Sequence, residues 1–407
     1  MERKVRLGIL RETKNPPDRR VPLSPPQVVE LMERFPDVKV CVQPSDIRGF
    51  ADEEYDYLKL DLTEEMKPCD ILVGVKEVDY NTFIEGKTYM FFSHVGKKQP
   101  HNRTMLQRAM EKKITLIDYE YLTDFQGRRI VAFGRWAGIV GAYNGLRARG
   151  ISTNSFELKP AHQCRDMEEM YAGLKKIELK PKKIIITGGG RVAMGAMETM
   201  RQLNIREVTH EEFLTQEFDE PVLCRLDPEY YVRHRGNKNG FDYKHFFAHP
   251  DEYENIFTPY TKVADIYIAA HFWDPQSPEL ISREDMQSPD FNISVIADVS
   301  CDVGGPIAST IRSSTIADPF YDYNPKTGKE EPAFSSKDNV TVMAVDNLPG
   351  ELPRNASVDF GDGLINNVFP HLFGHDDLDI IKRATILKEG ALTEKFAYLA
   401  DYAAGKE

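Results

Sequence analysis

Short apolar runs alternate with stretches of helical periodicity along the first 135 or so residues. The runs that we expect to form strands are 5–10, 38–42, 71–75, 89–93 and 114–117. Helical patterns lie between them, at 25–32 after a capping Ser24 and at 102–111. Because strands that alternate with helices are typical of βαβ units, this part of the chain predicts a mostly parallel sheet.

A segment rich in small residues, 133–142, follows and predicts a tightly packed helix that joins two domains. A second α/β unit is expected to begin at 182–187 and to continue with strands at 264–270, 295–299 and 340–345, and residues 376–399 read as helical. We therefore predict an α/β fold of two Rossmann-like domains with mostly parallel sheets and a cleft between them. Residues 1–140 plus about 346–407 would form the catalytic domain, and 141–345 the dinucleotide-binding domain.

Residues 225–262 differ from their surroundings by a high density of aromatic side chains, with three histidines among them: His234, His245 and His249. The simpler interpretation is an insertion that packs over its own aromatic cluster. The alternative interpretation is a cap over the nucleotide site or an interface.

The composition of the chain is consistent with this two-domain prediction. A length of 407 residues supports two domains, and 52 basic against 64 acidic residues give a net charge of −12. That sign argues against general binding to nucleic acid or to anionic membranes, and no apolar run reaches the roughly 20 residues of a membrane span. The expected partners are small-molecule substrates, and a second copy of the chain in a homo-oligomer.

The five cysteines are scattered and lack a CxxC pair, which indicates reduced thiols rather than disulfides or a zinc site, so no metal is expected. The first residues pass directly into a strand-like run without a signal-peptide pattern. The expected location is the cytoplasm.

A glycine-rich loop follows the strand at 182–187 and opens a helix. Its residues are Gly188, Gly189, Gly190, Arg191 and Val192, and Ala193 stands at the third position of the G-x-G-x-x-G/A pattern. Glycines let the backbone approach a pyrophosphate, and the helix N-terminus supplies amide donors. Strand, loop and helix in this order predict a dinucleotide site.

The acidic residue expected about 20 positions further on, which would bind a ribose hydroxyl, is ambiguous. Thr209 and His210 suit a 2′-phosphate as readily as a hydroxyl, whereas Glu211 favours NAD. The cofactor is therefore NAD or NADP.

Two predicted strands upstream of this loop end on titratable side chains, Lys76 with Glu77 after one and His94 after the other. Lysine and histidine together can transfer protons near neutral pH once burial or neighbouring charges adjust their pKa values. Arginine forks suit carboxylate binding, and Arg20 and Arg129 follow loops beside the same sheet.

Three acids also end strands: Glu120, Asp298 and Asp346. Glu120 could adjust the pKa of the lysine. Asp298 and Asp346 fit either turn-capping residues or ligand contacts.

These residues resemble those on which the alanine dehydrogenase / saccharopine dehydrogenase (L-lysine-forming) superfamily is built. The segments that carry the resemblance are 9–14, 19–25, 75–77, 93–94 and 126–129. The later segments 298–305, 315–320 and 345–349 look like the lysine–ketoglutarate reductase portion of the bifunctional lysine-degrading enzyme.

The resemblance implies an NAD(P)-dependent oxidoreductase that joins lysine and 2-oxoglutarate into saccharopine, or runs the reverse reaction. It implies that Lys76 and His94 are the acid–base pair, that Glu77 and Glu120 modulate the lysine, and that Arg20 and Arg129 hold substrate carboxylates. Asp346 would lie by the amino-acid substrate, and the glycine loop would hold the dinucleotide. Asp298 is a candidate for cofactor binding because of its position at the end of a strand in the nucleotide domain. An alanine-dehydrogenase-like enzyme is the nearer alternative, and a dinucleotide-binding regulatory protein without turnover the more distant one.

Overall fold

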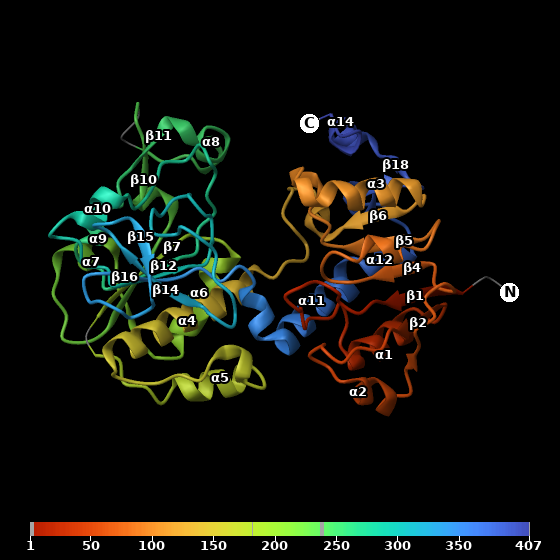
Figure 1. The fold of residues 1–407 in the computed structure, drawn as a ribbon, viewed down its shortest axis with the longest axis horizontal. Helices are drawn as coiled ribbons and strands as arrows, with labels where there is room; N and C mark the ends of the chain where they lie inside the picture. Colours follow the sequence, from red (N-terminus) through yellow and green to blue (C-terminus); the bar gives the residue numbers. More distant parts are fainter. Residues whose placement is uncertain (1–3, 181, 237–239, 407) are drawn as a thin grey trace. The chain divides into compact units, whose positions relative to one another are not determined.

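Two compact units make up the chain in the computed structural model, which describes residues 4–180, 182–236 and 240–406 (Figure 1). Unit 1 comprises Met1–Phe133 and Pro353–Glu407, and unit 2 comprises Gly134–Leu352. The sequence predicts boundaries near 140 and 345, whereas the first observed boundary falls just before the long helix α4 (Gly134–Thr153), which belongs to unit 2 as a whole.

Unit 1 is built on a sheet of eight described strands in the order β18-β17-β6-β5-β4-β1-β2-β3, part of which can be followed in Figure 1. The strands are β1 (Val5–Ile9), β2 (Val38–Val42), β3 (Asp61–Leu62), β4 (Ile71–Val73), β5 (Thr88–Phe91), β6 (Thr115–Asp118), β17 (Thr385–Lys388) and β18 (Ala391–Leu392). The first six run parallel, as predicted. The chain leaves β1 towards β2 and β3 and then crosses to β4 on the other side, so the point where strand order reverses lies between β1 and β4.

The helices of unit 1 cover this sheet and complete its apolar core. They are α1 (Pro25–Arg34), α2 (Asp52–Tyr57), α3 (Arg103–Glu111), α11 (Pro353–Asn367), α12 (Phe369–Phe373), α13 (Ile380–Ala384) and α14 (Ala400–Ala403). The α1 helix begins after Ser24, whose N–H donates to the Gln27 side chain at 3.0 Å, and the same Gln27 amide donates to the Val358 carbonyl in α11. This one side chain therefore links the start of α1 to α11, more than 300 residues away along the chain.

The prediction of a helix over 376–399 is wrong. Only Ile380–Ala384 is α-helical there, and the chain then forms β17, which pairs antiparallel with β6, and β18, which pairs antiparallel with β17. Glu389 and Gly390 have φ values of 49° and 83°, the left-handed conformations of a two-residue hairpin turn. The turn and the open edge of β6 override the local helical pattern.

Unit 2 contains a second sheet of eight described strands in the order β15-β14-β16-β13-β12-β7-β9-β8. The strands are β7 (Lys183–Thr187), β8 (Arg206–Glu207), β9 (Val222–Leu226), β12 (Ile266–Ala269), β13 (Val295–Asp298), β14 (Phe320–Asn324), β15 (Lys329–Glu331) and β16 (Val340–Met343). Apart from the antiparallel edge strands β14 and β15, they run parallel. An α/β fold with two mostly parallel sheets is thus confirmed.

The strand next to β7 is β9 and not β8, which lies at the edge. The ribose-binding residues were expected at 209–211, which follow β8, and 225 was expected to begin an insertion. β9 is fully apolar except for Arg225 and lies within that supposed boundary. The inserted segment therefore begins only after Leu226.

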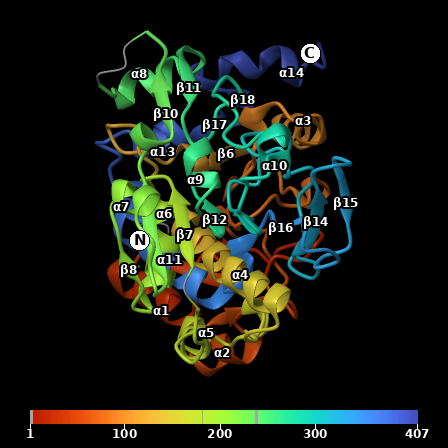
Figure 2. The ribbon, with the colours of Figure 1, turned by 90° about the vertical axis from the view of Figure 1, so that its left-hand side faces the viewer.

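The aromatic segment forms a small two-stranded ribbon of β10 (Val232–His234) and β11 (Tyr253–Asn255), with α8 (Tyr243–Ala248) between the strands (Figure 2). Its aromatic residues Tyr231, Phe246, Tyr253, Phe257 and Tyr260 are buried in the apolar core of unit 2. This observation agrees with the interpretation of a segment that packs over its own aromatic cluster.

The remaining helices of unit 2 are α5 (Met167–Leu174), α6 (Arg191–Arg201), α7 (His210–Thr215), α9 (Thr258–Thr261) and α10 (Arg283–Gln287). Helix α6 packs closely on α4 (Figure 2), because glycines remove the side chains at the crossing. A Cβ at Gly138 would lie 1.8 Å from the Val192 carbonyl oxygen, and one at Gly195 would lie 2.0 Å from the Arg135 carbonyl oxygen. Backbone against backbone leaves no room for either methyl group.

Across the described residues, none of the helices combines the length and the apolar character needed to span a bilayer.

The glycine crossing predicts that Gly138→Ala destabilises the protein by roughly 1–3 kcal/mol, because α4 and α6 must separate. The matched control is Gly173→Ala in α5, where nothing lies within 4 Å of the new methyl group; it should leave stability unchanged or raise it by roughly 0.5–1 kcal/mol. Thermal unfolding followed by calorimetry compares the two variants. Equal transition temperatures would contradict the close crossing.

Candidate functional site

Four neighbouring strands of unit 1 end on polar side chains at one edge of the sheet. The strands β6, β5, β4 and β1 lie side by side and parallel, so their carboxyl ends meet there. The residues that follow them are Glu12 after β1, Lys76 and Glu77 after β4, His94 after β5 and Glu120 after β6. Sequence analysis named all of these except Glu12.

Glu12 connects the ends of β1 and β4. It is 8% exposed, and its two carboxyl oxygens accept hydrogen bonds from the N–H groups of Val75 at 2.6 Å and Lys76 at 2.9 Å. Burial raises its pKa to about 8 against the lowering effect of the two amides. Glu12 could have been predicted from the same pattern as Lys76, because it is a charged residue that follows closely after an apolar strand.

Asp18 and Arg20 form a buried ion pair in the loop after β1. The Arg20 fork donates from Nε to Oδ1 at 3.0 Å and from Nη2 to Oδ2 at 2.6 Å, and both side chains are at most 2% exposed. The guanidinium also lies 4.2 Å from the centre of the Phe133 ring. Burial by itself would raise the pKa of Asp18, but the charge and hydrogen bonds of Arg20 outweigh it and lower that pKa.

Lys76 is half-buried, and its ammonium is destabilised. Burial lowers its pKa to about 8, assisted by the positive charges of Arg20 and Lys14 and opposed by Asp18 and Glu77. Roughly 300-fold more of the neutral amine is present at pH 7 than for a lysine with a pKa of 10.5. Lys76 is therefore able to act as a base or an acid near neutral pH.

Glu77 joins His94 to this group. His94 Nδ1 lies 2.6 Å from Glu77 Oε1, and Lys14 Nζ lies 3.3 Å from Oε2. Burial would raise the pKa of Glu77, but the hydrogen bond and charge of His94 lower it to about 2. A carboxylate on Nδ1 fixes the imidazole tautomer that leaves Nε2 for proton transfer.

The backbone at His94 is left-handed, with φ 55° and ψ 8°, at the start of the 3₁₀ helix η2 (Val95–Lys97). That conformation costs roughly 1–2 kcal/mol for a residue with a Cβ. The imidazole also stacks on Phe92, with ring centres 6.2 Å apart. An unfavourable backbone conformation in a residue held on both sides is typical of a functional position.

Glu120 belongs to a separate pair. Its Oε1 accepts a very short hydrogen bond from Arg129, and its buried Oε2 has no hydrogen-bond partner among the described residues. The Arg129 side chain is 49% exposed. Lys97 Nζ lies 3.7 Å from the same Oε1, so the cations that the structure places beside Glu120 are Arg129 and Lys97.

The glycine loop of unit 2 lies at the end of β7, before α6. Gly188 has a φ of 114°, and a Cβ there would lie 2.5 Å from the Ala270 carbonyl oxygen; a Cβ at Gly189 would lie 2.4 Å from Asp227 Oδ1. Gly190 precedes α6, and its own Cβ position is open. Bare backbone at the N-terminus of an eleven-residue helix fits a pyrophosphate.

Arg191 and Val192 are the other two residues of the loop that were predicted to bind the cofactor. Arg191 is exposed at the start of α6. Val192 packs on Gly134 and Gly138 of α4, which is a structural contact.

The carboxylate beside the loop is Asp227, which follows β9 and which the sequence analysis missed. Arg225 donates to both of its oxygens, at 2.6 and 2.9 Å, and to the Gly188 carbonyl at 3.0 Å. Thr209 instead caps α7 by accepting the Glu212 N–H, and the His210 ring packs against Tyr230 in a tilted arrangement with ring centres 4.3 Å apart. Both follow the edge strand β8, so the structure places them one strand further from β7 than predicted.

A second missed residue, His271, follows β12. Its Nδ1 lies 2.7 Å from Thr187 Oγ1, and its Nε2 is buried without a hydrogen-bond partner in the described part of the chain. Burial lowers its pKa to about 4, so the ring is neutral. β7 and β12 are the strands between which the order of this sheet reverses, which is where open α/β sheets bind ligands.

The two remaining predicted acids belong to unit 2. Asp298 is fully buried, and its carboxylate accepts hydrogen bonds from Ser300, Cys301 and Thr310 in the following loop. Asp346 is exposed after β16. The geometry of Asp298 corresponds to its turn-capping interpretation.

The fold is shared with solved proteins of known activity. An L-alanine dehydrogenase matches with a TM-score of 0.67 at 17% identity, over 99% of this chain and 100% of the other. A transhydrogenase from Sinorhizobium meliloti matches with a TM-score of 0.59 at 15% identity, over 95% and 98% of the two chains.

Curated relatives extend along nearly the whole chain. Alpha-aminoadipic semialdehyde synthase from Arabidopsis thaliana is 27% identical over 97% of this chain, and the mitochondrial protein of that name from Mus musculus is 29% identical over 97%. This chain spans only 41% and 47% of their lengths. Saccharopine dehydrogenase [NAD(+), L-lysine-forming] from Neurospora crassa is 26% identical over 86% of both chains.

Two family models match consecutive parts of the sequence. Residues 8–140 match the N-terminal domain of alanine dehydrogenase/PNT, and residues 161–398 match its C-terminal domain. Because the second match alone covers more than half of the chain and the first covers most of the remainder, the protein belongs to the alanine dehydrogenase/PNT family.

Proposed function

We propose that this protein is a nicotinamide-dependent dehydrogenase acting on amino acids, of the lysine-forming saccharopine dehydrogenase type. Its reaction would join an amino group of lysine to the keto carbon of 2-oxoglutarate and reduce the resulting imine to saccharopine, or run in reverse. The family and the similarity to semialdehyde synthases and saccharopine dehydrogenases support an amino-acid dehydrogenase. The specific substrates are the proposed part.

The observation that carries the proposal is the pairing of a low-pKa lysine with a carboxylate-held histidine at adjacent strand ends. Lys76 and Glu77 follow β4, His94 follows β5, and Glu77 bonds to the histidine at 2.6 Å. Formation of an imine needs a base that takes a proton from the attacking amine and an acid that protonates the departing hydroxyl. A lysine whose pKa is lowered by burial and an imidazole held by a carboxylate meet that requirement.

The steps assigned to the chain are proton transfers and orientation. Neutral Lys76 accepts a proton from the substrate amine as it attacks the keto carbon. His94 enters as the imidazolium, with Nδ1–H bonded to Glu77, and donates its Nε2 proton as the carbinolamine loses water. The dinucleotide, when bound, supplies the hydride that reduces the imine. Glu77 holds the imidazole throughout, because its carboxylate is bonded to Nδ1.

The two arginines have different proposed roles. Arg129 is half-exposed and bidentate in shape, so we assign it to a substrate carboxylate beside Glu120. Arg20 is 2% exposed and forms a fork with Asp18, so we assign it mainly to the positive potential that keeps the pKa of Lys76 low.

For the cofactor we propose NAD rather than NADP. The carboxylate of Asp227 lies beside Gly189, where it would accept a hydrogen bond from a ribose hydroxyl and repel a 2′-phosphate. Arg225, the nearby cation, is already bonded to both oxygens of Asp227.

An alanine-dehydrogenase-like reaction on pyruvate and ammonia is the second candidate. The shared fold with L-alanine dehydrogenase over 99% of this chain favours it. The two reactions require the same proton transfers and differ in the size of the amine.

A substrate panel separates these candidates. Purified protein is given NADH or NADPH with pyruvate or 2-oxoglutarate and with ammonia or lysine, and absorbance at the nicotinamide band is followed. We expect oxidation with 2-oxoglutarate plus lysine, faster with NADH than with NADPH. Preference for pyruvate plus ammonia would overturn the substrate assignment, and no oxidation with any pair would overturn the enzymatic function.

Removal of either proton-transfer group should lower turnover while dinucleotide binding persists. Lys76→Met and His94→Gln are each expected to reduce kcat by about 10²–10⁴-fold, the range for acid–base groups. Lys67→Met, an exposed lysine of the same unit, is the matched control and should retain activity. Nearly normal kcat in both variants, measured with saturating substrates, would contradict the assignment.

The pH dependence of activity should report the ionisation of Lys76. Activity that needs its neutral form rises with pH and levels off above about 8, where burial has placed the pKa. Lys14→Met removes a positive charge that helps to lower this pKa, so the rising limb should move to higher pH. Lys39→Met, exposed on β2, should leave the limb in place, and a shift to lower pH in Lys14→Met would contradict the electrostatic explanation.

A further inference from the structure

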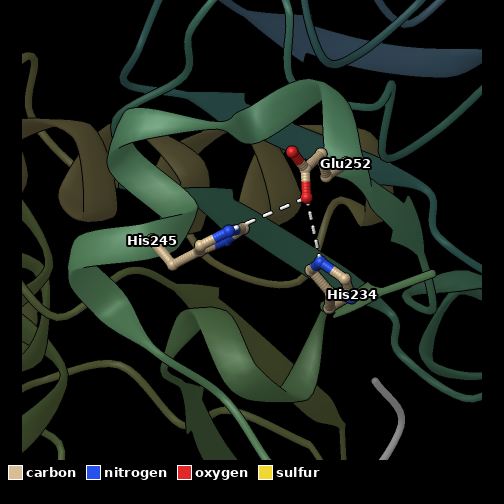
Figure 3. A group of neighbouring side chains, drawn as sticks. All are labelled: His234, His245 and Glu252. Carbon is tan, nitrogen blue, oxygen red and sulfur yellow. Dashed lines mark hydrogen bonds and ion pairs between the residues drawn. The ribbon is translucent and has the colours of Figure 1, made fainter. Parts of the chain in front are cut away.

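Two histidines and a glutamate converge on the aromatic ribbon of unit 2, in a group that the proposed reaction does not use. His234 ends β10, His245 lies in α8, and Glu252 ends the short turn η7 (Pro250–Glu252) before β11. Figure 3 shows the three side chains pointing towards one another, with one oxygen of Glu252 facing both rings. We call these residues the ribbon cluster.

The spacing within the ribbon cluster is that of metal ligands. His234 Nε2 lies 3.1 Å and His245 Nε2 3.7 Å from Glu252 Oε2. Ligand atoms about 2.0–2.1 Å from a tetrahedral zinc ion are about 3.3 Å apart, so both observed separations lie within a few tenths of an ångström of that value. All three ligand atoms lie within 4.8 Å of one another, so the two histidines need only close around the ion.

The surroundings suit a cation at this point. A cavity of about 400 Å³ adjoins the cluster and is lined by Phe241, Asp242 and Tyr253 besides the two histidines. The Glu252 side chain is 48% exposed, which leaves water access to a fourth ligand position.

The second nitrogen of each ring has its own partner. His245 Nδ1 lies 3.2 Å from the Tyr253 hydroxyl, which itself lies 3.5 Å from the Asp242 carbonyl. If that hydroxyl donates to the carbonyl, it accepts from Nδ1 and leaves the Nε2 lone pair of His245 for a metal. The Nδ1 of His234 accepts a hydrogen bond from the Gly236 N–H at 3.0 Å, so the proton of this ring is on Nε2 and points to Glu252. Zinc binding at Nε2 would move that proton to Nδ1 and break the hydrogen bond from Gly236.

We propose that the ribbon cluster binds one zinc ion through His234 Nε2, His245 Nε2 and Glu252 Oε2, with water as the fourth ligand. Two imidazoles and one carboxylate form a donor set that zinc takes in proteins. The ion would join α8 to both strands of the ribbon and so stabilise this segment. The cluster is the one group of this kind among the described residues, so the expected stoichiometry is one ion per chain.

The test uses the full chain after dialysis against a chelator. Zinc chloride is titrated by calorimetry at pH 7.5 and at pH 5.5, and cobalt(II) replaces zinc in a parallel absorbance experiment. We expect one ion per chain, the visible bands of tetrahedral cobalt, a higher unfolding temperature with zinc, and weaker binding at pH 5.5, because protons compete with the metal for nitrogen ligands.

Matched variants separate ligation from a loss of folding. Glu252→Gln keeps the size of the side chain but removes the anionic ligand, and His245→Ala removes a nitrogen; each should weaken zinc binding by about tenfold or more. The controls are Glu254→Gln on β11 and His375→Ala, an exposed histidine of unit 1, which should bind zinc like the parent protein.

Absence of binding at micromolar zinc in the parent protein would overturn the proposal. So would equal affinity in Glu252→Gln and Glu254→Gln, because the ion would then be held elsewhere. Circular dichroism of each variant without metal identifies any that is unfolded, and the remaining ligand variant then decides.

Discussion

A buried carboxyl group at the strand crossover of unit 1 determines where the proposed chemistry can occur. Glu12 follows β1, and it accepts the backbone N–H groups of Val75 and Lys76 at the end of β4. A carboxyl group buried to this degree is stable only when its oxygens are hydrogen-bonded, and each such bond to an uncharged group contributes roughly 0.5–1.5 kcal/mol. The end of β4 therefore cannot move away from β1 without a large cost in free energy. This constraint fixes the backbone from which the Lys76 side chain extends.

The low pKa of Lys76 follows from how the surrounding charges are already paired. Two carboxylates lie near enough to stabilise its ammonium, but Asp18 is bonded to Arg20, and Glu77 is bonded to His94 and Lys14. Each carboxylate is therefore already paired with a cation, and the positive charges of Arg20 and Lys14 also lower the pKa of Lys76 directly. With the attraction largely cancelled, burial dominates and favours the neutral amine. Because the acidic neighbours of Lys76 are paired with other cations, this lysine can stay neutral and act as a base in a site that contains many charges.

The sequence predicted the parallel core of both units and the strand ends at Lys76 and His94, because apolar runs and glycine loops are local signals. The prediction from sequence failed where the structure of a segment depends on which strand it pairs with in the sheet. Residues 376–399 were expected to be helical, but the hairpin turn at Glu389 and Gly390 and the open edge of β6 make part of them strand. Likewise, the carboxylate beside the glycine loop is Asp227, because β9 rather than β8 lies next to β7, and strand order is not a property of any local pattern. Glu12 was missed for a different reason: its role depends on amide groups more than 60 residues away.

The position of β9 also changes the interpretation of the aromatic segment. Since the segment begins directly after Asp227, it is continuous with the wall of the glycine loop and not an independent addition. Tyr231 packs on His271 with ring centres 5.8 Å apart, and His271 is bonded to Thr187, the residue immediately before the loop. The ribbon strand β10 begins at the residue after Tyr231. Whatever orders the ribbon, whether its aromatic packing or an ion in the ribbon cluster, therefore also restrains the side chains behind the dinucleotide loop.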